Sequence, residues 1–486
     1  MLESAINRTA RKQNVFHWQG AKLLPSFFVF LIAVLIWISP HPEALSLQVW
    51  HLFAIFFATI FAIITLPLPV GAIALFALSM TMLTGTLNFQ ELSIGYVQPS
   101  LWMLTLAFFL ADGLIKTNLA MRIAYLFISV LGHRIMGLSY GIIICELILA
   151  PFIPSIVVRS SCVIFPIVLA IGKGLNEKGK GYPGYESAGF LILVAFHSSV
   201  ITSAMFLTSM AGNPLIIEMA RDLGINITWG TWALASFVPG TISLSLLPWI
   251  IYKVYPPDLT DIPKAPKIAK EKLQEMGPIS FKEWIMCGVF LLVLSMWLFG
   301  EKVGIDRLEA CFLGVSLLLF FGIITWDNCL KNTTAWNTFF WLGAIIGIGT
   351  QLKNLGLFDW AGENILRMMG SPPWQIGFLI IAIVYFYTHY FFAGNVAHIT
   401  SMYMTFLATA LKLGAPPLFA ALILAFLSNL FGGLTHYGTA PALVYFSSSL
   451  VSLKKWWKVG FVCGTINLVI WIGIGSLWLK IIGFCQ

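Results

Sequence analysis

The chain has 486 residues, of which 59% are hydrophobic and only 10% are charged, and its mean hydropathy is +0.89. Soluble domains carry roughly 25% charged residues, so this composition excludes a soluble globular protein and predicts a polytopic membrane protein. The formal net charge of +8 comes from the loops rather than from one basic face, which argues against a nucleic-acid partner.

The N-terminal segment, residues 1–24, contains Arg8, Arg11, Lys12 and Lys22. An excess of Lys and Arg marks the cytoplasmic side of a membrane, so we predict a cytoplasmic N-terminal segment and a multi-pass protein of a bacterial inner membrane. A membrane-spanning helix needs about 20 mostly apolar residues. Apolar runs of this kind occur at residues 25–39, 49–66, 101–115, 188–210, 233–251, 284–299, 310–324, 376–392, 415–430 and 459–479.

Residues 145–168 hold two short apolar arms around a polar centre that contains Ser155 and Arg159. A re-entrant hairpin with a polar tip fits this pattern better than a crossing helix. A charge in such a segment is costly unless it faces water or an anion, and the guanidinium fork matches a carboxylate. Arg159 is therefore a predicted carboxylate ligand, unless it snorkels at the hairpin end. Glu146 pairs either with a cation or with Arg159.

The apolar run at 188–210 is followed by Gly212, Asn213 and Pro214. Proline removes a backbone donor and clashes with the preceding turn, and asparagine bonds its own backbone. An interrupted helix is tolerated in a bilayer only where it is buried or lines a polar cavity. We predict two half-helices whose free N–H groups attract an anion and whose unwound carbonyls can hold a cation. The alternative is a proline kink without a ligand.

Residues 253–282 contain six lysines and four acidic residues. Their low hydrophobicity and high charge predict a polar cytoplasmic linker with one short amphipathic helix.

The sequence after this linker repeats the polar hairpin tip and the helix breaker of the first half. A second polar tip lies at 394–398, and a second helix breaker at 438–441. The corresponding pairs are Lys116 with Lys353 (353 − 116 = 237), Arg159 with His398 (398 − 159 = 239) and Pro214 with Pro441 (441 − 214 = 227). Such repeats, each with an interrupted hydrophobic segment, place the binding site of secondary transporters near the bilayer midplane.

The two tips and the two breaks should converge on one pocket. The predicted substrate-binding residues are Ser155, Arg159, Thr208, Asn213, Pro214, Asn395, His398, Thr435, Thr439 and Pro441. Hydroxyls, amides, one arginine and several helix N-termini favour a small polyanion, most simply a dicarboxylate. We predict no cofactor other than Na⁺ as a coupling ion, near Ser155, Gly212, Gly394, Asn395 and Gly438.

Four stretches resemble the divalent anion:sodium symporter family, within it the branch of plastid 2-oxoglutarate/malate translocators and bacterial citrate or tartrate exchangers. They are SSVITSAMFLTSMAGNPL, YFFAGNVAHITSMYMTFLA, SNLFGGLTHYGTAPALVYF and WWKVGFVCGTINLVIWIGIGSLWLKIIG. The resemblance implies an all-α homodimer with two inverted repeats, each with a re-entrant hairpin and a broken helix. It also implies scaffold helices at 25–135 and 283–370, and an elevator-like transport domain at 136–252 and 371–486.

The family's hairpin tips carry Ser-Asn-Thr motifs that hold substrate carboxylate and Na⁺, and this chain departs from them. The first tip reads Ser155-Ile156-Val157 and the second Gly394-Asn395-Val396. The amide and the second hydroxyl of the motif are therefore missing at the first tip, where only Ser155 remains, whereas Arg159 matches the exchanger-like branch.

The predicted function is secondary active transport of dicarboxylates of the 2-oxoglutarate, malate and succinate class, by exchange or by Na⁺ symport. The alternatives are a citrate/tartrate-type exchanger, an anion channel, and a membrane enzyme that uses His389, His398 and His436. The sequence argues against the enzyme because His389 and His398 are nine residues apart and have no acidic residue near them. Membrane lipid and a second copy of the chain are the expected partners.

Overall fold

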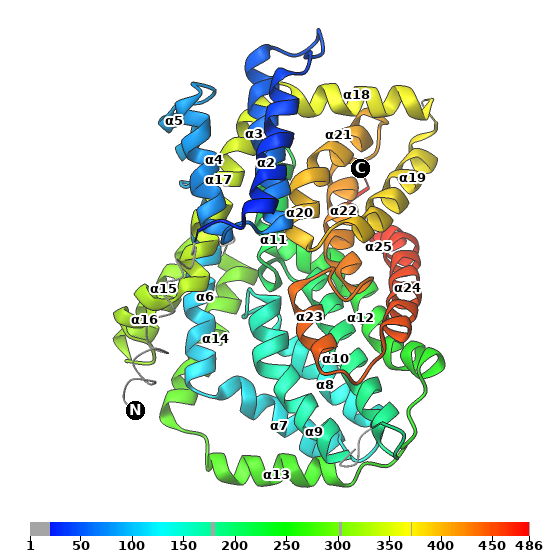
Figure 1. The fold of residues 1–486 in the computed structure, drawn as a ribbon. Helices are drawn as coiled ribbons and strands as arrows, with labels where there is room; N and C mark the ends of the chain where they lie inside the picture. The colour runs from blue at the N-terminus through cyan, green and yellow to red at the C-terminus, as the bar shows by residue number, and fades with distance from the viewer. Residues whose placement is uncertain (1–19, 176–179, 301–303, 371, 486) are drawn as a thin grey trace, which may run out of the picture.

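The computed structural model describes residues 20–175, 180–300, 304–370 and 372–485 (Figure 1). In these ranges the regular structure is helical, and the only β-type pairing is one bridge between Arg134 and Asp261. Within the described residues, eight helices are long and apolar enough to cross a membrane. The prediction of an all-α polytopic membrane protein is confirmed.

The first half of the chain forms three successive groups of helices. The first group contains α2 (Leu23–Ile38), α3 (Leu47–Thr65), α4 (Val70–Leu83) and the short α5 (Phe89–Ser93). The second contains α6 (Pro99–Lys116) and α7 (Leu119–Leu131). The third contains α8 (Ile135–Leu149), the π-helix η1 (Val157–Ile164), α9 (Phe165–Leu175), α10 (Tyr185–Met205), the 3-10 turn η2 (Leu207–Ser209), α11 (Gly212–Asp222) and α12 (Trp229–Val254).

The second half follows the same order after α13 (Lys264–Met276). Its first helices are α14 (Phe281–Phe299), α15 (Arg307–Phe320), α16 (Trp326–Lys331), α17 (Thr333–Asn354) and α18 (Leu357–Met369). The next are α19 (Trp374–Tyr387), η4 (Thr388–Phe391), α20 (Asn395–His398), η5 (Ile399–Tyr403) and α21 (Met404–Lys412). The last are α22 (Pro417–Leu430), η6 (Phe431–Gly433), α23 (Ala440–Ser447), α24 (Leu453–Val469), η7 (Ile470–Ile474) and α25 (Gly475–Ile481).

The two halves are inverted repeats. Helices α7 and α18 are 13 residues long, and their starts are 238 positions apart (357 − 119). Each follows a left-handed residue, Asn118 with φ 59° and Gly356 with φ 85°. Figure 1 places α7 at the lower end of the molecule and α18 at the upper end. The predicted inverted repeat is confirmed.

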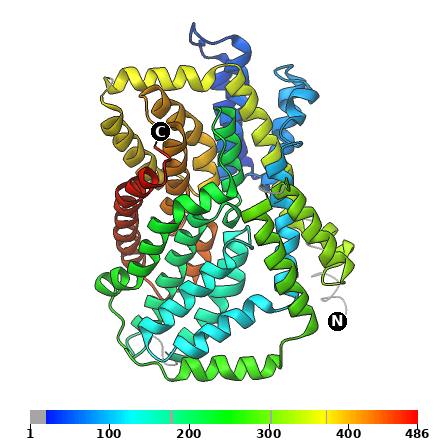
Figure 2. The ribbon, with the colours of Figure 1, turned by 180° about the vertical axis from the view of Figure 1, so that it is seen from behind.

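Each repeat contains a helical hairpin whose two arms begin and finish at the same end of the molecule. Helix α8 packs against α7, and α9 packs against α13, which runs along the lower end in Figures 1 and 2. Helices α19 and α21 pack against each other, and α21 packs against α18 at the upper end. Both hairpins contain a π-helix, η1 or η5, directly after the tip, and π-helical turns are frequent at functional sites.

The helix breaks lie a few residues before the predicted positions. Helix α10 ends at Met205, and Gly212, Asn213 and Pro214 form the first turn of α11. A proline is tolerated there because the first N–H groups of a helix have no intrahelical acceptor. The unwound stretch is therefore 206–211, and the prediction that the Gly-Asn-Pro triplet itself unwinds is wrong. In the second repeat Gly438 and Thr439 lie in the unwound stretch, whereas Ala440 begins α23.

The predicted linker contains the expected amphipathic helix, α13, and holds it against the first repeat. Before α13, the Asp258 carboxylate accepts hydrogen bonds from the backbone N–H groups of Gly184 (2.6 Å) and Ser187 (2.9 Å) at the start of α10. Burial raises the pKa of this carboxyl, but the hydrogen bonds from Ser187 and Gly184 outweigh burial and hold it below its usual value.

After α13, the buried Arg122 of α7 fixes the turn into α14. Its side chain forms an ion pair with Glu283 at 2.5 Å and donates to the carbonyl oxygen of Gly277 at 2.9 Å. The two side chains are only 8% and 3% exposed. A buried ion pair is costly to break because the remaining partner keeps an uncompensated charge.

We expect Arg122→Met to lower the free energy of unfolding by about 3–5 kcal/mol, because Glu283 is left buried and unpaired. The double variant Arg122→Met/Glu283→Gln should recover most of this loss, since glutamine keeps the cap at the start of α14 without a charge. Thermal melting of the purified protein in detergent measures both. A single variant as stable as the wild type would contradict the anchoring role of this pair.

Candidate substrate site

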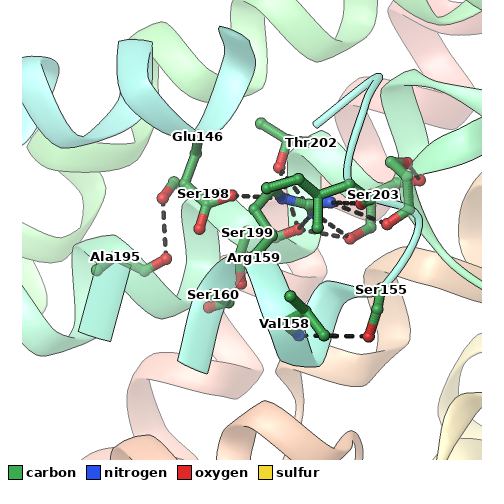
Figure 3. A network of polar contacts seen from close by, with 12 residues as sticks. Glu146, Ser155, Val158, Arg159, Ser160, Ala195, Ser198, Ser199, Thr202 and Ser203 are labelled. Atoms are coloured by element: carbon green, nitrogen blue, oxygen red, sulfur yellow. Dashed lines mark hydrogen bonds and ion pairs between the residues drawn. The ribbon is translucent and has the colours of Figure 1, made fainter. Parts of the chain in front are cut away.

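The first hairpin tip is the turn that links Leu149, at the end of α8, to Val157, at the start of η1. Ser155 Oγ accepts a hydrogen bond from the backbone N–H of Val158 at 3.3 Å (Figure 3). Ser155 is 8% exposed. Its hydroxyl bonds the first turn of the π-helix from a buried position in the tip, where the sequence predicts a substrate ligand.

Arg159, one turn further on, is fully buried at the centre of a polar network (Figure 3). Its Nε donates to Glu146 Oε2 at 2.7 Å. Its other N–H groups donate to the carbonyl oxygens of Ile153 (3.1 Å), Ser209 (2.9 Å) and Ser199 (3.3 Å) and to the hydroxyl of Ser203 (3.0 Å). An arginine has five N–H donors, and each has a protein acceptor here. In this conformation no donor remains for a substrate carboxylate.

The network joins three segments that are far apart in the sequence. Ile153 belongs to the hairpin tip, Ser209 to the helix break, and Ser203 to α10. Of the two roles open to Glu146, the structure shows the pairing with Arg159. Contact between Arg159 and the substrate stays a prediction.

The first break is closed by its own polar side chains. Thr208 Oγ1 donates to the carbonyl oxygen of Pro151 at 2.5 Å and accepts from the indole N–H of Trp229 at 3.2 Å. Asn213 Nδ2 donates to the carbonyl oxygens of Ser203 and Phe206, both at 3.1 Å. The bonds from Asn213 satisfy carbonyls that the missing helical turn leaves free, and the bond from Thr208 ties the break to the hairpin tip.

The second tip follows the same plan with a glycine in a special conformation. Gly394 has φ 152° and precedes α20; side chains rarely adopt such a backbone angle. Asn395 Nδ2 donates to the carbonyl oxygens of Ser428 (2.9 Å) and Asn429 (3.3 Å) at the end of α22. All four predicted ligands of this repeat are buried: Asn395 is 6% exposed, Thr439 5% and Thr435 0%, and Pro441 is also buried.

A direct hydrogen bond joins the two breaks. Asn429 Nδ2 donates to Asn213 Oδ1 at 2.8 Å, across 216 residues of sequence. Asn429 was missed in the sequence analysis. Its position in SNLFGG, on the last turn before the second break, is the signal that could have identified it, because Asn213 stands beside the first break.

The predicted ligand His398 belongs to a buried histidine pair. Its Nδ1 lies 3.1 Å from Nδ1 of His389, and Nε2 of His389 lies 2.8 Å from the carbonyl oxygen of Gly438. A carbonyl oxygen only accepts, so His389 carries a proton on Nε2. His436 lies elsewhere and accepts from the indole N–H of Trp457 at 3.1 Å. Two of the three histidines considered for an enzyme are thus adjacent, despite their spacing in the sequence.

Three buried side-chain oxygens at the second break have no hydrogen-bond partner among the described residues: Asn395 Oδ1, Asn429 Oδ1 and Thr435 Oγ1. A Cβ at Gly432 would lie 2.9 Å from Asn395 Oδ1, and one at Gly438 would lie 3.0 Å from Thr435 Oγ1. The break loop therefore runs against both oxygens. Buried polar atoms are normally paired, so these oxygens indicate a place where a ligand can bind.

The family is identified by comparison with known proteins. The model of the sodium:sulfate symporter transmembrane region matches residues 20–485. The chain belongs to this family. Chloroplastic dicarboxylate transporter 1 of Spinacia oleracea is 45% identical over 471 residues, which cover 96% of this chain and 82% of that protein. The putative malate transporter YflS of Bacillus subtilis is 43% identical over 480 residues, which cover 99% of each chain.

The resemblance to the divalent anion:sodium symporters is thus confirmed, as is the multi-pass membrane class. Among solved structures, the YdaH transporter of Alcanivorax borkumensis has a TM-score of 0.55 at 12% sequence identity and covers 92% of this chain and 100% of its own. At this identity the likeness concerns the fold alone. It supports the helical architecture of this sodium:sulfate symporter family member.

We expect Arg159→Gln to lower the free energy of unfolding by about 3–5 kcal/mol, because Glu146 keeps a buried charge without its partner. Arg159→Gln/Glu146→Gln removes both charges and should regain most of the stability. Thermal melting in detergent compares the two variants. If Arg159→Gln alone melts at the wild-type temperature, the pair does not hold this region together.

Proposed function

We propose that this chain is a secondary transporter that exchanges dicarboxylates of the 2-oxoglutarate, malate and succinate class across a bacterial inner membrane without Na⁺. The names of the chloroplast dicarboxylate transporter and of the Bacillus malate transporter support the substrate class. A citrate/tartrate-type exchanger is the second candidate, because the sequence also resembles the bacterial citrate or tartrate exchangers.

The observation that carries the proposal is the buried guanidinium of Arg159. Transporters hold Na⁺ with unwound backbone carbonyls at helix breaks. Here the carbonyl oxygens of Ile153 and Ser209, at the first tip and the first break, already accept hydrogen bonds from Arg159 Nη1. The guanidinium thus occupies backbone carbonyls beside the predicted sodium positions Ser155 and Gly212, and its charge is balanced by Glu146. No coupling ion is required there.

In the second repeat, a protein donor occupies only one of the predicted sodium ligands. The carbonyl oxygen of Gly438, a predicted sodium ligand, accepts a hydrogen bond from His389. The free oxygens of Asn395 and Thr435 are the atoms that a single Na⁺ would use in this repeat, with Gly394 beside them. They favour sodium symport as the competing mechanism.

We divide the predicted substrate ligands into two groups by their exposure and contacts. Ser155 at the first tip and Thr439 at the second break are 8% and 5% exposed, and their hydroxyls would bind the substrate carboxylates with the N-terminal N–H groups of α11 and α23. Asn395 would contact the substrate only through its acceptor oxygen, because both of its amide hydrogens are bonded to backbone carbonyls. The second group would hold the tips and breaks in place from the protein interior. It contains Arg159, Thr208, Asn213, Pro214, His398, Thr435 and Pro441.

The remaining parts of the proposal concern assembly and motion. Helices in 25–135 and 283–370 would form a fixed scaffold and a homodimer interface in the lipid, after the cytoplasmic segment 1–24. The parts at 136–252 and 371–486 would move as one transport domain, because the Asn213–Asn429 hydrogen bond joins them, and 253–282 would be the cytoplasmic link. The relatives are transporters, which fits a protein without enzymatic activity.

The test is uptake of labelled 2-oxoglutarate into proteoliposomes that contain malate or are empty, each with and without an inward Na⁺ gradient. We expect saturable uptake that requires internal malate and does not respond to Na⁺, because Arg159 already occupies the backbone carbonyls that would hold a sodium ion. Na⁺-driven uptake into empty vesicles would overturn exchange in favour of symport. Uptake that neither saturates nor depends on internal malate would indicate a channel.

A further inference from the structure

A cavity of about 310 Å³ lies between the first hairpin and the scaffold helices, away from the breaks described above. Ile153 and Val158 line it from the hairpin side. Its other lining residues come from α6, α16 and the start of α17: Phe108, Ala111, Asp112, Ile115, Asn328, Lys331, Asn332, Thr333 and Thr334. Cavities of roughly 300–1,000 Å³ hold small-molecule ligands, so this one is large enough for a small organic acid.

One wall of the cavity attracts anions. Lys331 ends α16, and its pair with Asp327 (2.7 Å) is exposed on both sides, with side chains 75% and 62% accessible. Such surface pairs are weak, so the ammonium can turn to a bound anion. Thr333 and Thr334 begin the 22-residue helix α17, and their N–H groups have no intrahelical acceptor.

The lining of the cavity also includes a carboxylate, that of Asp112. Asp112 lies within the apolar helix α6, is half-buried, and interacts electrostatically with Lys116 one turn further along. A carboxylate in such a helix is costly and normally faces a polar cavity. The cavity therefore presents a cationic and an anionic group to the same space.

The cavity also touches the first hairpin tip. The carbonyl oxygen of Ile153, in its wall, accepts from Arg159 Nη1 at 3.1 Å, and the N–H of Val158 donates to Ser155 Oγ. A ligand in the cavity is separated from the predicted site only by the tip itself.

We propose that this cavity is a second dicarboxylate site, which the substrate occupies on its way to or from the hairpin tips. Lys331 and the start of α17 hold one carboxylate, and Asp112 repels anions that carry a third. The site therefore favours dianions over trianions such as citrate. This inference rests on the proposed function of dicarboxylate exchange.

The first test is Lys331→Gln in malate/2-oxoglutarate exchange, with Lys272→Gln as the matched control. Lys272 also forms an exposed pair on a helix, with Glu275 at 2.6 Å, but it lies on α13, away from the cavity. We expect Lys331→Gln to raise KM roughly tenfold without changing kcat and to weaken the dependence of uptake on ionic strength. Lys272→Gln should change neither. A wild-type KM in Lys331→Gln would overturn the site.

The second test compares citrate with malate as the external substrate, in wild-type protein and in Asp112→Asn. The wild type should prefer malate, and the variant should raise citrate uptake relative to malate several-fold, because the repulsive charge is gone. An unchanged ratio, or equal use of both acids by the wild type, overturns the role of Asp112. If the wild-type protein exchanges no dicarboxylate at all, the proposed function itself is overturned. This outcome differs from a failure of the second site alone, in which exchange persists.

Discussion

A guanidinium group buried in a membrane protein is the constraint on which the first repeat depends. The effective cost of removing a charge from water is several kcal/mol, and it is offset only when the charge is paired and its hydrogen bonds are satisfied. Arg159 meets this condition with Glu146 and with carbonyl oxygens from the hairpin tip, the helix break and α10. These segments can lie together only in the arrangement that surrounds the charge.

In both repeats, the unwound backbone also needs hydrogen-bond partners. Each break in a membrane helix leaves carbonyl and N–H groups without partners, and polar side chains supply them from neighbouring segments. Asn213 and Thr208 do this at the first break, and Asn395 and His389 at the second. Most of the polar residues between the repeats are therefore used to stabilise the breaks, which leaves few groups at the surface of the site.

Under the proposed exchange mechanism, Arg159 takes the place of a sodium ion at the first break of this sodium:sulfate symporter family member. A fixed internal cation keeps the carbonyls of the break in place whether or not an ion is bound. Binding and release of the substrate then change the charge of the site, and no ion compensates for that change. This property suits obligatory exchange, in which one substrate replaces another. The proposed second site in the cavity beside α17, which Lys331 and Asp112 both line, adds charge selection outside the site itself.

The sequence by itself determined the helical class, the order of the repeats, both hairpins and the neighbourhood of both breaks. These features follow from local composition and from matching pairs that are 237, 239 and 227 residues apart. Even there, the first break lies upstream of its predicted position, because a proline fits the first turn of a helix. Only the tertiary structure decided which groups meet: Arg159 with Glu146, His389 with His398, and Asn213 with Asn429. Such pairs depend on how hairpins and half-helices pack in three dimensions, and hydrophobic spacing along one segment carries no information about its partner in another.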